Sequence, residues 1–238
     1  MGETVSLRPT KELFIDVLTR DISVHDCILD LLDNAVDSYT KNGIAERREI
    51  RLDYGQDGLR LVDNCGGIPK VRFMSEVFRL GSSDPTSSGP TIGVYGIGLK
   101  RSVFKLGRLI VVETDDGRDY CRLKIDVDQW LSEPDNWEVP LTESSPSRLG
   151  GGGLPYTSIE VSKLTRAAKE TFTPEFERRL KETVKIYYSL FIQDGQIGFF
   201  LNDEEQTGFE LTVKAGADYM PVRVADKYDG AEIDIISS

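Results

Sequence analysis

Four polar residues near the start of the chain have the spacing of a metal-binding or catalytic surface. Asp30, Asp33, Asn34 and Asp37 follow one another at i, i+3, i+4 and i+7, so in a helix they form one line on its surface. Neighbouring carboxylates repel one another unless a cation or hydrogen bonds compensate, and an amide oxygen among them suits Mg²⁺. An ordinary solvated polar face is the alternative interpretation.

A second candidate is the turn after an apolar strand, which reads Leu-Val-Asp-Asn-Cys-Gly-Gly-Ile-Pro from residue 61 to residue 69. Asp63 ends the strand, where its carboxylate could accept a hydrogen bond from a ligand amino group in an apolar cleft. Gly66 and Gly67 would let a flat ring approach the backbone closely. The alternative is a plain strand-to-helix turn, with Pro69 at the first helical position.

A third candidate is a glycine-rich stretch with a lysine, formed by Gly93, Gly96, Gly98, Leu99 and Lys100. Glycines let backbone N–H groups converge on one point, and the start of a helix adds positive potential there. Lys100 supplies a full charge, so the stretch could hold phosphate groups. Its spacing differs from the P-loop and from the dinucleotide-binding fingerprint. Taken alone, it is also compatible with a simple turn.

The order of these motifs resembles that of the GHKL superfamily, the ATPases with the Bergerat fold. The family pattern E-x-x-x-N-A-x-D matches Asp-Leu-Leu-Asp-Asn-Ala-Val-Asp at residues 30–37, and D-x-G-x-G-[IV] matches Asp-Asn-Cys-Gly-Gly-Ile at residues 63–68. The third pattern, G-x-x-G-x-G, matches Gly93, Gly96 and Gly98. The fourth pattern is G-T before a strand, and Tyr156-Thr157 resembles it. The resemblance covers roughly residues 10–200, and four ordered motifs are far more specific than one.

The resemblance implies an α+β fold, a two-layer sandwich in which helices cover one face of a mixed, mostly antiparallel sheet. It implies ATP and Mg²⁺ as ligands, with Asn34 as the metal ligand and Asp30 as the group that activates water. It also implies a nucleotide-dependent homodimer. The residues expected to bind nucleotide or its metal are Asn34, Asp37, Asp63, Gly67, Ile68, Ser82, Ser83, Gly93, Gly96, Gly98, Leu99, Lys100 and Thr157. Ser82 and Ser83 belong to residues 82–89, which the resemblance assigns to a lid over the nucleotide.

Three positions depart from the family pattern. Asp30 replaces a glutamate, and its shorter side chain reduces the reach that a general base needs, so hydrolysis is expected to be slow unless Asp33 or a shifted helix compensates. Cys65 replaces the first glycine of the second motif, which puts the local backbone geometry in question. Tyr156 replaces the glycine before Thr157, which makes the fourth motif the weakest.

The elements that must position these residues follow from periodicity and turn signals. We expect helices over residues 10–20, 23–41, 69–80, 93–106 and 174–191. Strands are expected over residues 49–54, 59–63, 109–113, 120–127, 157–161, 196–202, 209–214, 220–224 and 233–236, and loops over residues 81–90 and 144–153. We expect an ATP-binding domain over residues 1–195, and over residues 196–238 the start of a following domain that continues in a longer protein.

Composition limits the remaining possibilities. The 238 residues include 40 acidic and 29 basic ones, and the difference, 40 − 29 = 11, gives a net charge of −11. This excess argues against a broad nucleic-acid surface on this chain, although a nucleic acid or a protein client could bind a missing C-terminal region. The three cysteines suggest neither disulfides nor a zinc site. The start does not resemble a signal peptide, and no apolar run could span a bilayer, so we expect a cytoplasmic protein without membrane contact.

Three functions remain open at this point. The first is an ATP hydrolase whose nucleotide state drives lid closure and dimerisation. The second is a protein kinase of the histidine- or serine-directed type, disfavoured because only 29 residues precede Asp30. The third is a nucleotide-binding switch with little hydrolysis. In the family a following domain donates a lysine to the γ-phosphate, for which Lys214 and Lys227 are candidates only by their location.

Overall fold

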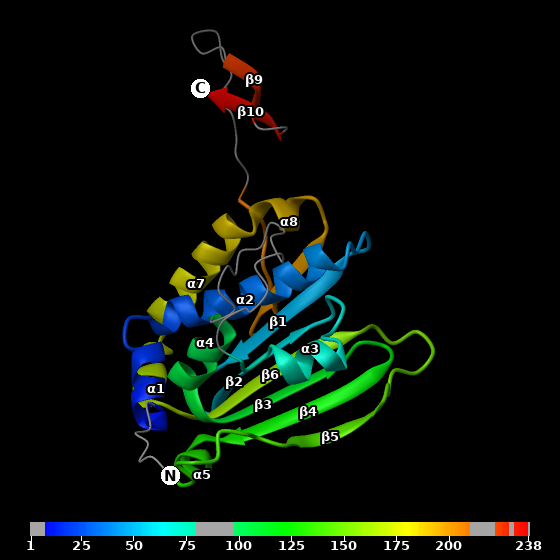
Figure 1. Ribbon diagram of the computed structural model, residues 1–238. Coiled ribbons are helices and arrows are strands. Elements are labelled where there is room, and N and C mark those ends of the chain that lie inside the picture. Colours follow the sequence, from blue (N-terminus) through cyan, green and yellow to red (C-terminus); the bar gives the residue numbers. More distant parts are fainter. Residues whose placement is uncertain (1–7, 80–97, 210–221, 229–230, 238) are drawn as a thin grey trace.

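The computed structural model describes residues 8–79, 98–209, 222–228 and 231–237, and an eight-stranded sheet forms its centre (Figure 1). The strands lie in the order β5-β4-β3-β6-β2-β1-β7-β8. Neighbouring strands in this sheet are antiparallel, except that β1 and β7 run parallel. Figure 1 shows the helices α1, α2, α4 and α7 on one side of the sheet. The predicted α+β class and mostly antiparallel sheet are therefore confirmed.

The element bounds are as follows. The strands are β1 (Arg48–Tyr54), β2 (Gly58–Asp63), β3 (Gly107–Asp115), β4 (Asp119–Asp126), β5 (Leu141–Pro146), β6 (Tyr156–Leu164), β7 (Ile197–Leu201), β8 (Glu204–Glu205), β9 (Val222–Tyr228) and β10 (Ala231–Ser237). The helices are α1 (Lys11–Thr19), α2 (Val24–Lys41), α3 (Lys70–Ser75), α4 (Gly98–Leu106), α5 (Val127–Leu131), α6 (Arg166–Thr171), α7 (Pro174–Tyr187) and α8 (Ser189–Gln193). Among the helices of the described residues, none is long and apolar enough to cross a membrane.

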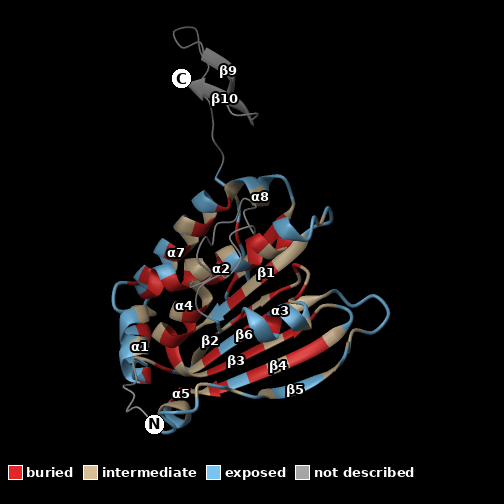
Figure 2. Cartoon of the chain, in the orientation of Figure 1, coloured by how far each residue is buried: buried red, intermediate tan, exposed pale blue. Residues whose placement is uncertain are grey.

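Helix α2 forms as its sequence predicts. Ser23 caps it, since its hydroxyl accepts the Asp26 N–H at 3.1 Å and donates to the Asp26 carboxylate at 2.6 Å. The apolar positions at helical spacing are all buried, at 4% exposed or less, namely Val24, Cys27, Ile28, Leu31, Leu32, Ala35 and Val36. This face of α2 packs against the sheet and α4. Buried residues concentrate between the layer of helices and the sheet (Figure 2). The opposite face is left for polar residues.

Strand alternation directs Asp63 toward the helices. In β2, Leu59, Leu61 and Asp63 alternate with exposed or half-buried residues and are all buried. Asp63 therefore lies on the core face of the sheet, at the end of its strand. Pairing with β6 sets Thr157 opposite Asp63, and pairing with β3 sets Thr114 opposite Thr157. A polar row thus crosses the end of an otherwise apolar face.

Several expected boundaries were wrong. The helix expected over residues 69–80 ends at Ser75, and its buried side chain is Phe73, whereas Val71 and Met74 are 79% and 66% exposed. Part of the loop expected over residues 144–153 is strand β5, which forms the edge of the sheet beside β4. The helix expected over residues 174–191 is divided at Tyr188 into α7 and α8. The short helices α5 and α6 were not predicted.

The C-terminal part contributes strands to two separate sheets. Strand β7 follows the expected boundary at residue 195, yet it pairs with β1 in the central sheet, and β8 pairs with β7. The domain boundary expected at residue 195 therefore stays a prediction. Strands β9 and β10 form a separate antiparallel pair. The strand expected over residues 209–214 lies, apart from Phe209, outside the described residues.

A buried lysine attaches α1 to the loop after α5. Lys11 is 2% exposed, and its Nζ donates to the backbone carbonyls of Trp130, Glu133 and Asn136, the last two at 2.6 Å. The same ammonium lies 4.3 Å from the centroid of the Trp130 ring. All three of its donors are therefore matched by acceptors.

Replacing Lys11 by methionine is expected to lower the free energy of unfolding by about 3 kcal/mol, because the apolar stem is kept while three partly buried carbonyls lose their donor. Equilibrium unfolding in urea would measure the loss. The exposed Lys124 provides the control, since Lys124→Met should change stability by less than about 0.5 kcal/mol. Equal values for the two variants would contradict a stabilising role for Lys11.

Candidate functional site

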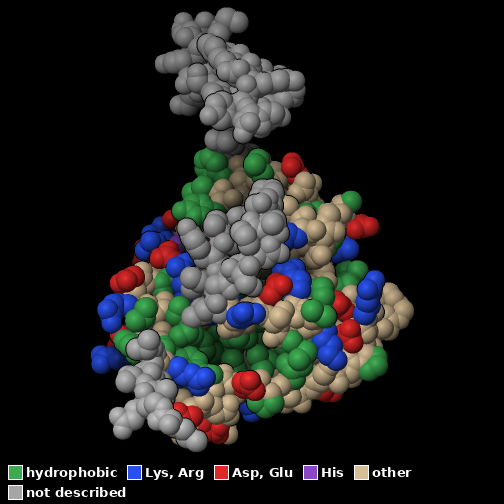
Figure 3. Space-filling view, in the orientation of Figure 1, with side chains coloured by type: hydrophobic (Ala, Val, Ile, Leu, Met, Phe, Trp, Pro, Cys, Tyr) green, Lys and Arg blue, Asp and Glu red, His purple; other side chains and the backbone are tan. Residues whose placement is uncertain are grey.

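A pocket of about 260 Å³ lies on the helix-covered face, where α2, α3 and the start of α4 meet the ends of β2 and β6. Eight residues predicted from the sequence line it: Asn34, Asp37, Asp63, Gly67, Ile68, Leu99, Lys100 and Thr157. Ser82, Ser83, Gly93 and Gly96 lie outside the described residues, and with them the expected lid. In Figure 3, hydrophobic side chains gather in the hollow between α4 and α3. The chain thus brings residues of four separate sequence motifs to one pocket.

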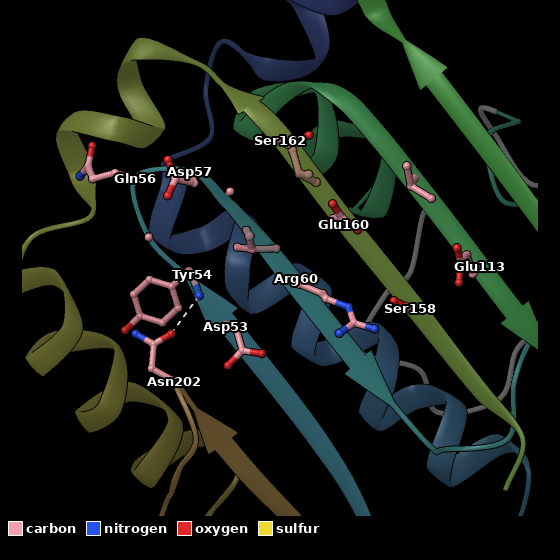
Figure 4. Close-up of a pocket in the computed structure, with 15 residues that line it drawn as sticks. Asp53, Tyr54, Gln56, Asp57, Arg60, Glu113, Ser158, Glu160, Ser162 and Asn202 are labelled. Carbon is pink, nitrogen blue, oxygen red and sulfur yellow. Dashed lines mark hydrogen bonds between the residues drawn. The ribbon is translucent and has the colours of Figure 1, made fainter. Parts of the chain in front are cut away.

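A second hollow, of about 540 Å³, lies on the uncovered face of the sheet. Figure 4 shows its lining, which includes Asp53, Arg60, Glu113 and Glu160 on adjacent strands. None of the residues predicted from the sequence lines this hollow, and its walls are the charged outer positions of β1, β2, β3 and β6. The motif-bearing pocket on the other face is therefore the candidate functional site.

Asp63 is the most deeply buried acid of the pocket, at 3% exposed. Burial raises the pKa of its carboxyl to about 7, although hydrogen bonds from Cys65 oppose the shift. Its Oδ1 accepts the Cys65 N–H at 2.9 Å. Thr157, 6% exposed, lies opposite it on β6 and lines the same pocket. This end of the pocket offers a carboxylate acceptor beside a hydroxyl, surrounded by Leu61 and Ile159.

The turn after Asp63 requires glycine at two of its positions. Gly67 has a φ of +67°, and a Cβ there would lie 2.5 Å from the Asp115 backbone oxygen. Gly66 has a φ of +118°. Cys65 has neither feature, so the replacement of the family glycine at this position leaves the turn intact. The Cys65 carbonyl accepts hydrogen bonds from Ser38 and Asn42 of α2 and its cap, each at 3.0 Å.

Thr114 fixes the other side of this turn. Its hydroxyl accepts the Ile68 N–H at 2.7 Å and donates to the Tyr156 carbonyl at 3.0 Å. Thr114 is fully buried and belongs to the same row as Asp63 and Thr157. The second and fourth motifs are therefore joined through one hydroxyl of β3, and Tyr156 in place of glycine does not prevent this pairing.

Asn34 lies on the exposed face of α2, one turn before Ser38, and lines the pocket. Its Nδ2 donates to the backbone carbonyl of Asp30, which leaves Oδ1 as its acceptor atom. Mg²⁺ accepts one protein oxygen when phosphate and water complete its six ligands, so this donor fits the metal. The described residues contain no group of three His, Cys, Asp or Glu side chains placed for a metal. Asn34 is thus suited to a metal ion whose other ligands are phosphate and water, and not to one held by protein side chains alone.

Asp37 and Lys100 bring opposite charges to the pocket. Asp37 is 7% exposed, and its carboxylate lies 3.5 Å from the Lys41 ammonium. Lys100 is 4% exposed, and burial lowers its pKa, with Glu76 acting in the opposite direction. Lys100 belongs to α4, two residues after Gly98, and brings a cationic side chain to the pocket. This end of the pocket is suited to an anion.

Asp30 and Asp33 do not line the pocket, although they lie on α2 with Asn34 and Asp37 at the expected helical spacing. The Asp30 carboxylate forms a two-point ion pair with Arg101, Nε to Oδ2 at 2.8 Å and Nη2 to Oδ1 at 3.1 Å. Asp33 accepts a hydrogen bond from the Tyr188 hydroxyl at 2.6 Å. Burial raises the pKa of Asp33, and the Tyr188 hydrogen bond opposes this shift. The Asp33 carboxylate is therefore engaged by Tyr188, which lies between α7 and α8.

A family model places the chain among known proteins. The model of the histidine kinase-, DNA gyrase B- and HSP90-like ATPases matches residues 22–169, more than half of the chain. The chain belongs to this family. The matched span of this GHKL-family chain contains all of the motifs named above, from α2 to Thr157.

Two solved structures of the ATPase region of Saccharomyces cerevisiae topoisomerase II share the fold of this GHKL domain. The one bound to ICRF-187 (dexrazoxane) aligns with a TM-score of 0.55 and 16% identity, over 76% of this chain and 48% of that one. The other has a TM-score of 0.55 and 17% identity, over 75% and 47%. The GHKL chain thus spans about half the length of these two. Among curated proteins, none matches the sequence.

Sequence reasoning missed four residues that shape the site of this GHKL domain. Thr114, Arg101, Ser102 and Tyr188 hold the motif residues but belong to no family pattern. Arg101 and Ser102 directly follow Lys100, so their position on the same helix was a usable signal. Thr114 and Tyr188 are far from their partners in sequence, and nothing in their local pattern indicates those contacts.

Proposed function

We propose that this protein binds Mg·ATP in the pocket and hydrolyses it. The observation that carries the proposal is the arrangement within one cavity: the buried Asp63 carboxylate beside Thr157 at one end, with Asn34 and Lys100 also lining it. Family membership supports the nucleotide. Lid closure over residues 82–89 and homodimerisation, as in the clamp-like members of the superfamily, are part of the same proposal.

The Asp63 end is suited to adenine. A carboxylate is an acceptor only, and the adenine amino group is a donor, so the two are complementary. Because Cys65 already occupies Oδ1, the remaining acceptor capacity of Asp63 is available to the pocket. Thr157 supplies a hydroxyl that can donate or accept beside it. Gly67 and Ile68 provide a flat wall, since no side chain projects from Gly67.

The Asn34 end is suited to the phosphates. Lys100 and the start of α4 offset negative charge, and Asn34 presents an amide oxygen. When bound, Mg²⁺ would neutralise phosphate charge at the Asn34 oxygen. Asp37, which lines the pocket one turn further along α2, would accept from water at this site.

Hydrolysis would use Asp30 as the general base. The oxygen of a water molecule bonds to the γ-phosphorus, the bond from that phosphorus to the bridging oxygen breaks, and ADP leaves. The proton released by the water goes to the Asp30 carboxylate. Asp30 lies one turn before Asn34 on the same side of α2, and this position supports the role.

Replacing Asp30 by alanine is expected to preserve ATP binding and to lower kcat at least about a hundredfold, as removal of a general base does. Phosphate release by purified protein, together with a binding titration, would measure the two effects. Asp53→Ala, which removes an exposed carboxylate from the opposite face, is the control and should hydrolyse ATP like the wild type. If Asp30→Ala turns over as fast as the wild type, the base is another group.

A second candidate is a nucleotide-dependent switch that hydrolyses ATP very slowly. The two-point ion pair between Asp30 and Arg101 favours it, because this contact occupies the carboxylate. Binding of ATP with no detectable phosphate release would support the switch. Label from γ-labelled ATP retained on protein would instead indicate the kinase. A protein client or a nucleic acid as partner also stays a proposal.

A further inference from the structure

The Asp30 carboxylate is enclosed by three donors from α4. Arg101 contacts both of its oxygens, at 2.8 and 3.1 Å, and the Ser102 hydroxyl donates to Oδ2 at 3.1 Å. Ser102 is fully buried and the Asp30 side chain is 19% exposed. A Cβ added to Gly98 would lie 3.3 Å from the Asp30 carboxyl carbon, so α4 also approaches it closely by its backbone.

This enclosure limits what Asp30 can do. A carboxylate has about four lone-pair positions, and the three donors of α4 take three of them. Both lone pairs of Oδ2 are engaged, and Oδ1 is engaged by the guanidinium. A general base must present a lone pair to the attacking water within hydrogen-bond distance. In this arrangement the carboxylate acts mainly as an acceptor for α4.

We propose that Arg101 is a positioning residue that acts as a latch, holding Asp30 away from water and restraining hydrolysis until its side chain moves. The proposal rests on the proposed function, since it assigns a control to the ATP hydrolysis described above. The Arg101 side chain is 40% exposed, so it can leave the carboxylate without crossing the core. Ser102 would stay on Oδ2, so α2 and α4 remain joined when the latch opens.

The γ-phosphate of ATP is the group expected to open the latch. Arg101 directly follows Lys100, which lines the phosphate end of the pocket. A guanidinium binds phosphate through two parallel hydrogen bonds, as it binds a carboxylate, so the two anions compete for the same fork. The transfer of Arg101 from Asp30 to phosphate would free the base only when ATP is present. ADP, which lacks that phosphate, would leave the latch closed.

The test compares Arg101→Gln with the wild type in steady-state ATP hydrolysis. Arg101→Gln removes the charged fork and keeps most of the side chain, so kcat is expected to rise about fivefold while KM changes less than about twofold. Arg122→Gln is the matched control, because Arg122 forms a similar ion pair, 2.6 Å to Glu113, away from the pocket. The control should hydrolyse ATP like the wild type.

Two further variants show whether the effect acts through Asp30. The double variant Asp30→Asn, Arg101→Gln should hydrolyse ATP as slowly as Asp30→Asn alone. Arg101→Lys keeps the charge but cannot contact both oxygens in a planar fork, so its kcat should lie between those of wild type and Arg101→Gln. Without nucleotide, the losses of stability in Asp30→Asn and in Arg101→Gln should not add up to the loss in the double variant, because Asp30 and Arg101 are in contact. The unfolding midpoints of the three proteins would measure this.

The outcomes separate the latch from the proposed function. If the wild type hydrolyses ATP and Arg101→Gln, still folded and binding ATP, is no faster, Arg101 is only structural and the latch is overturned. A faster double variant also overturns it, since the gain would not depend on Asp30. If wild type and variants all bind ATP and none releases phosphate, the proposed hydrolysis fails and the latch fails with it. If none binds ATP, the nucleotide site itself is wrong.

Discussion

Replacing Asn34 by alanine is expected to weaken Mg·ATP binding about a hundredfold, equivalent to about 2.7 kcal/mol. Asn34 lines the pocket and is exposed on α2, so the change removes a ligand group without opening a hole in the core. Its Nδ2 is already bonded to the Asp30 carbonyl, which leaves Oδ1 as the acceptor. The fold should therefore survive, and the loss should appear in nucleotide affinity.

The magnesium dependence gives this expectation its sharpest test. Wild-type affinity for ATP should fall when Mg²⁺ is chelated, whereas Asn34→Ala should bind ATP equally weakly with and without the metal. Asn34→Asp keeps an oxygen at this position and should restore much of the magnesium dependence. Titration of a fluorescent ATP analogue would measure all three proteins. If the alanine variant retains the full effect of Mg²⁺ on affinity, Asn34 is not the metal ligand.

The first and second motifs were predictable because local rules determine them. The apolar repeat from Val24 to Val36 can bury only one face of a helix, so the polar line had to lie on the other. The alternation of Leu59, Leu61 and Asp63 likewise fixed the direction of the acid. Positive φ angles at Gly66 and Gly67 explain why glycine stands at these two positions.

The parts that sequence reasoning missed depend on contacts between distant segments. Val71 and Met74 have helical spacing but are exposed, and Phe73 is the side chain that α3 buries. Strand β5 is polar and mostly exposed, and only pairing with β4 makes it a strand. The partners of Asp30 and Asp33 lie 71 and 155 residues away. A local pattern identifies such acids as candidates but contains no information about what neutralises them.

Replacing Asp63 by asparagine is expected to stabilise the nucleotide-free protein above neutral pH. Burial raises the pKa of Asp63 to about 7 from 3.8 in the unfolded chain. Between these values the folded state holds a proton that the unfolded state has lost, so wild-type stability falls as pH rises from about 4 to about 7. Above pH 7 the full penalty applies, a few kcal/mol, since each pKa unit between the two states corresponds to about 1.4 kcal/mol.

The stability difference between Asp63→Asn and wild type should thus be small at pH 4, grow up to about pH 7 and then stay level. Urea unfolding across this range without nucleotide would measure it. Asp53→Asn, an exposed acid on the opposite face, is the control and should stay within about 0.5 kcal/mol of wild type. A difference that is flat from pH 4 to pH 8 would contradict the burial of an ionisable Asp63.

The same substitution is expected to weaken ATP binding by roughly 2 to 3 kcal/mol at pH 8, the cost of leaving a buried polar group without a partner. The Cys65 N–H bonds to Oδ1 of Asp63, so in the asparagine variant the carbonyl oxygen must remain there. The new amide NH₂ then faces the pocket and meets the amino group of adenine, donor against donor. One variant is therefore expected to gain folding stability and lose affinity. Loss of both would indicate a misfolded turn, and unchanged affinity would remove Asp63 from the adenine site.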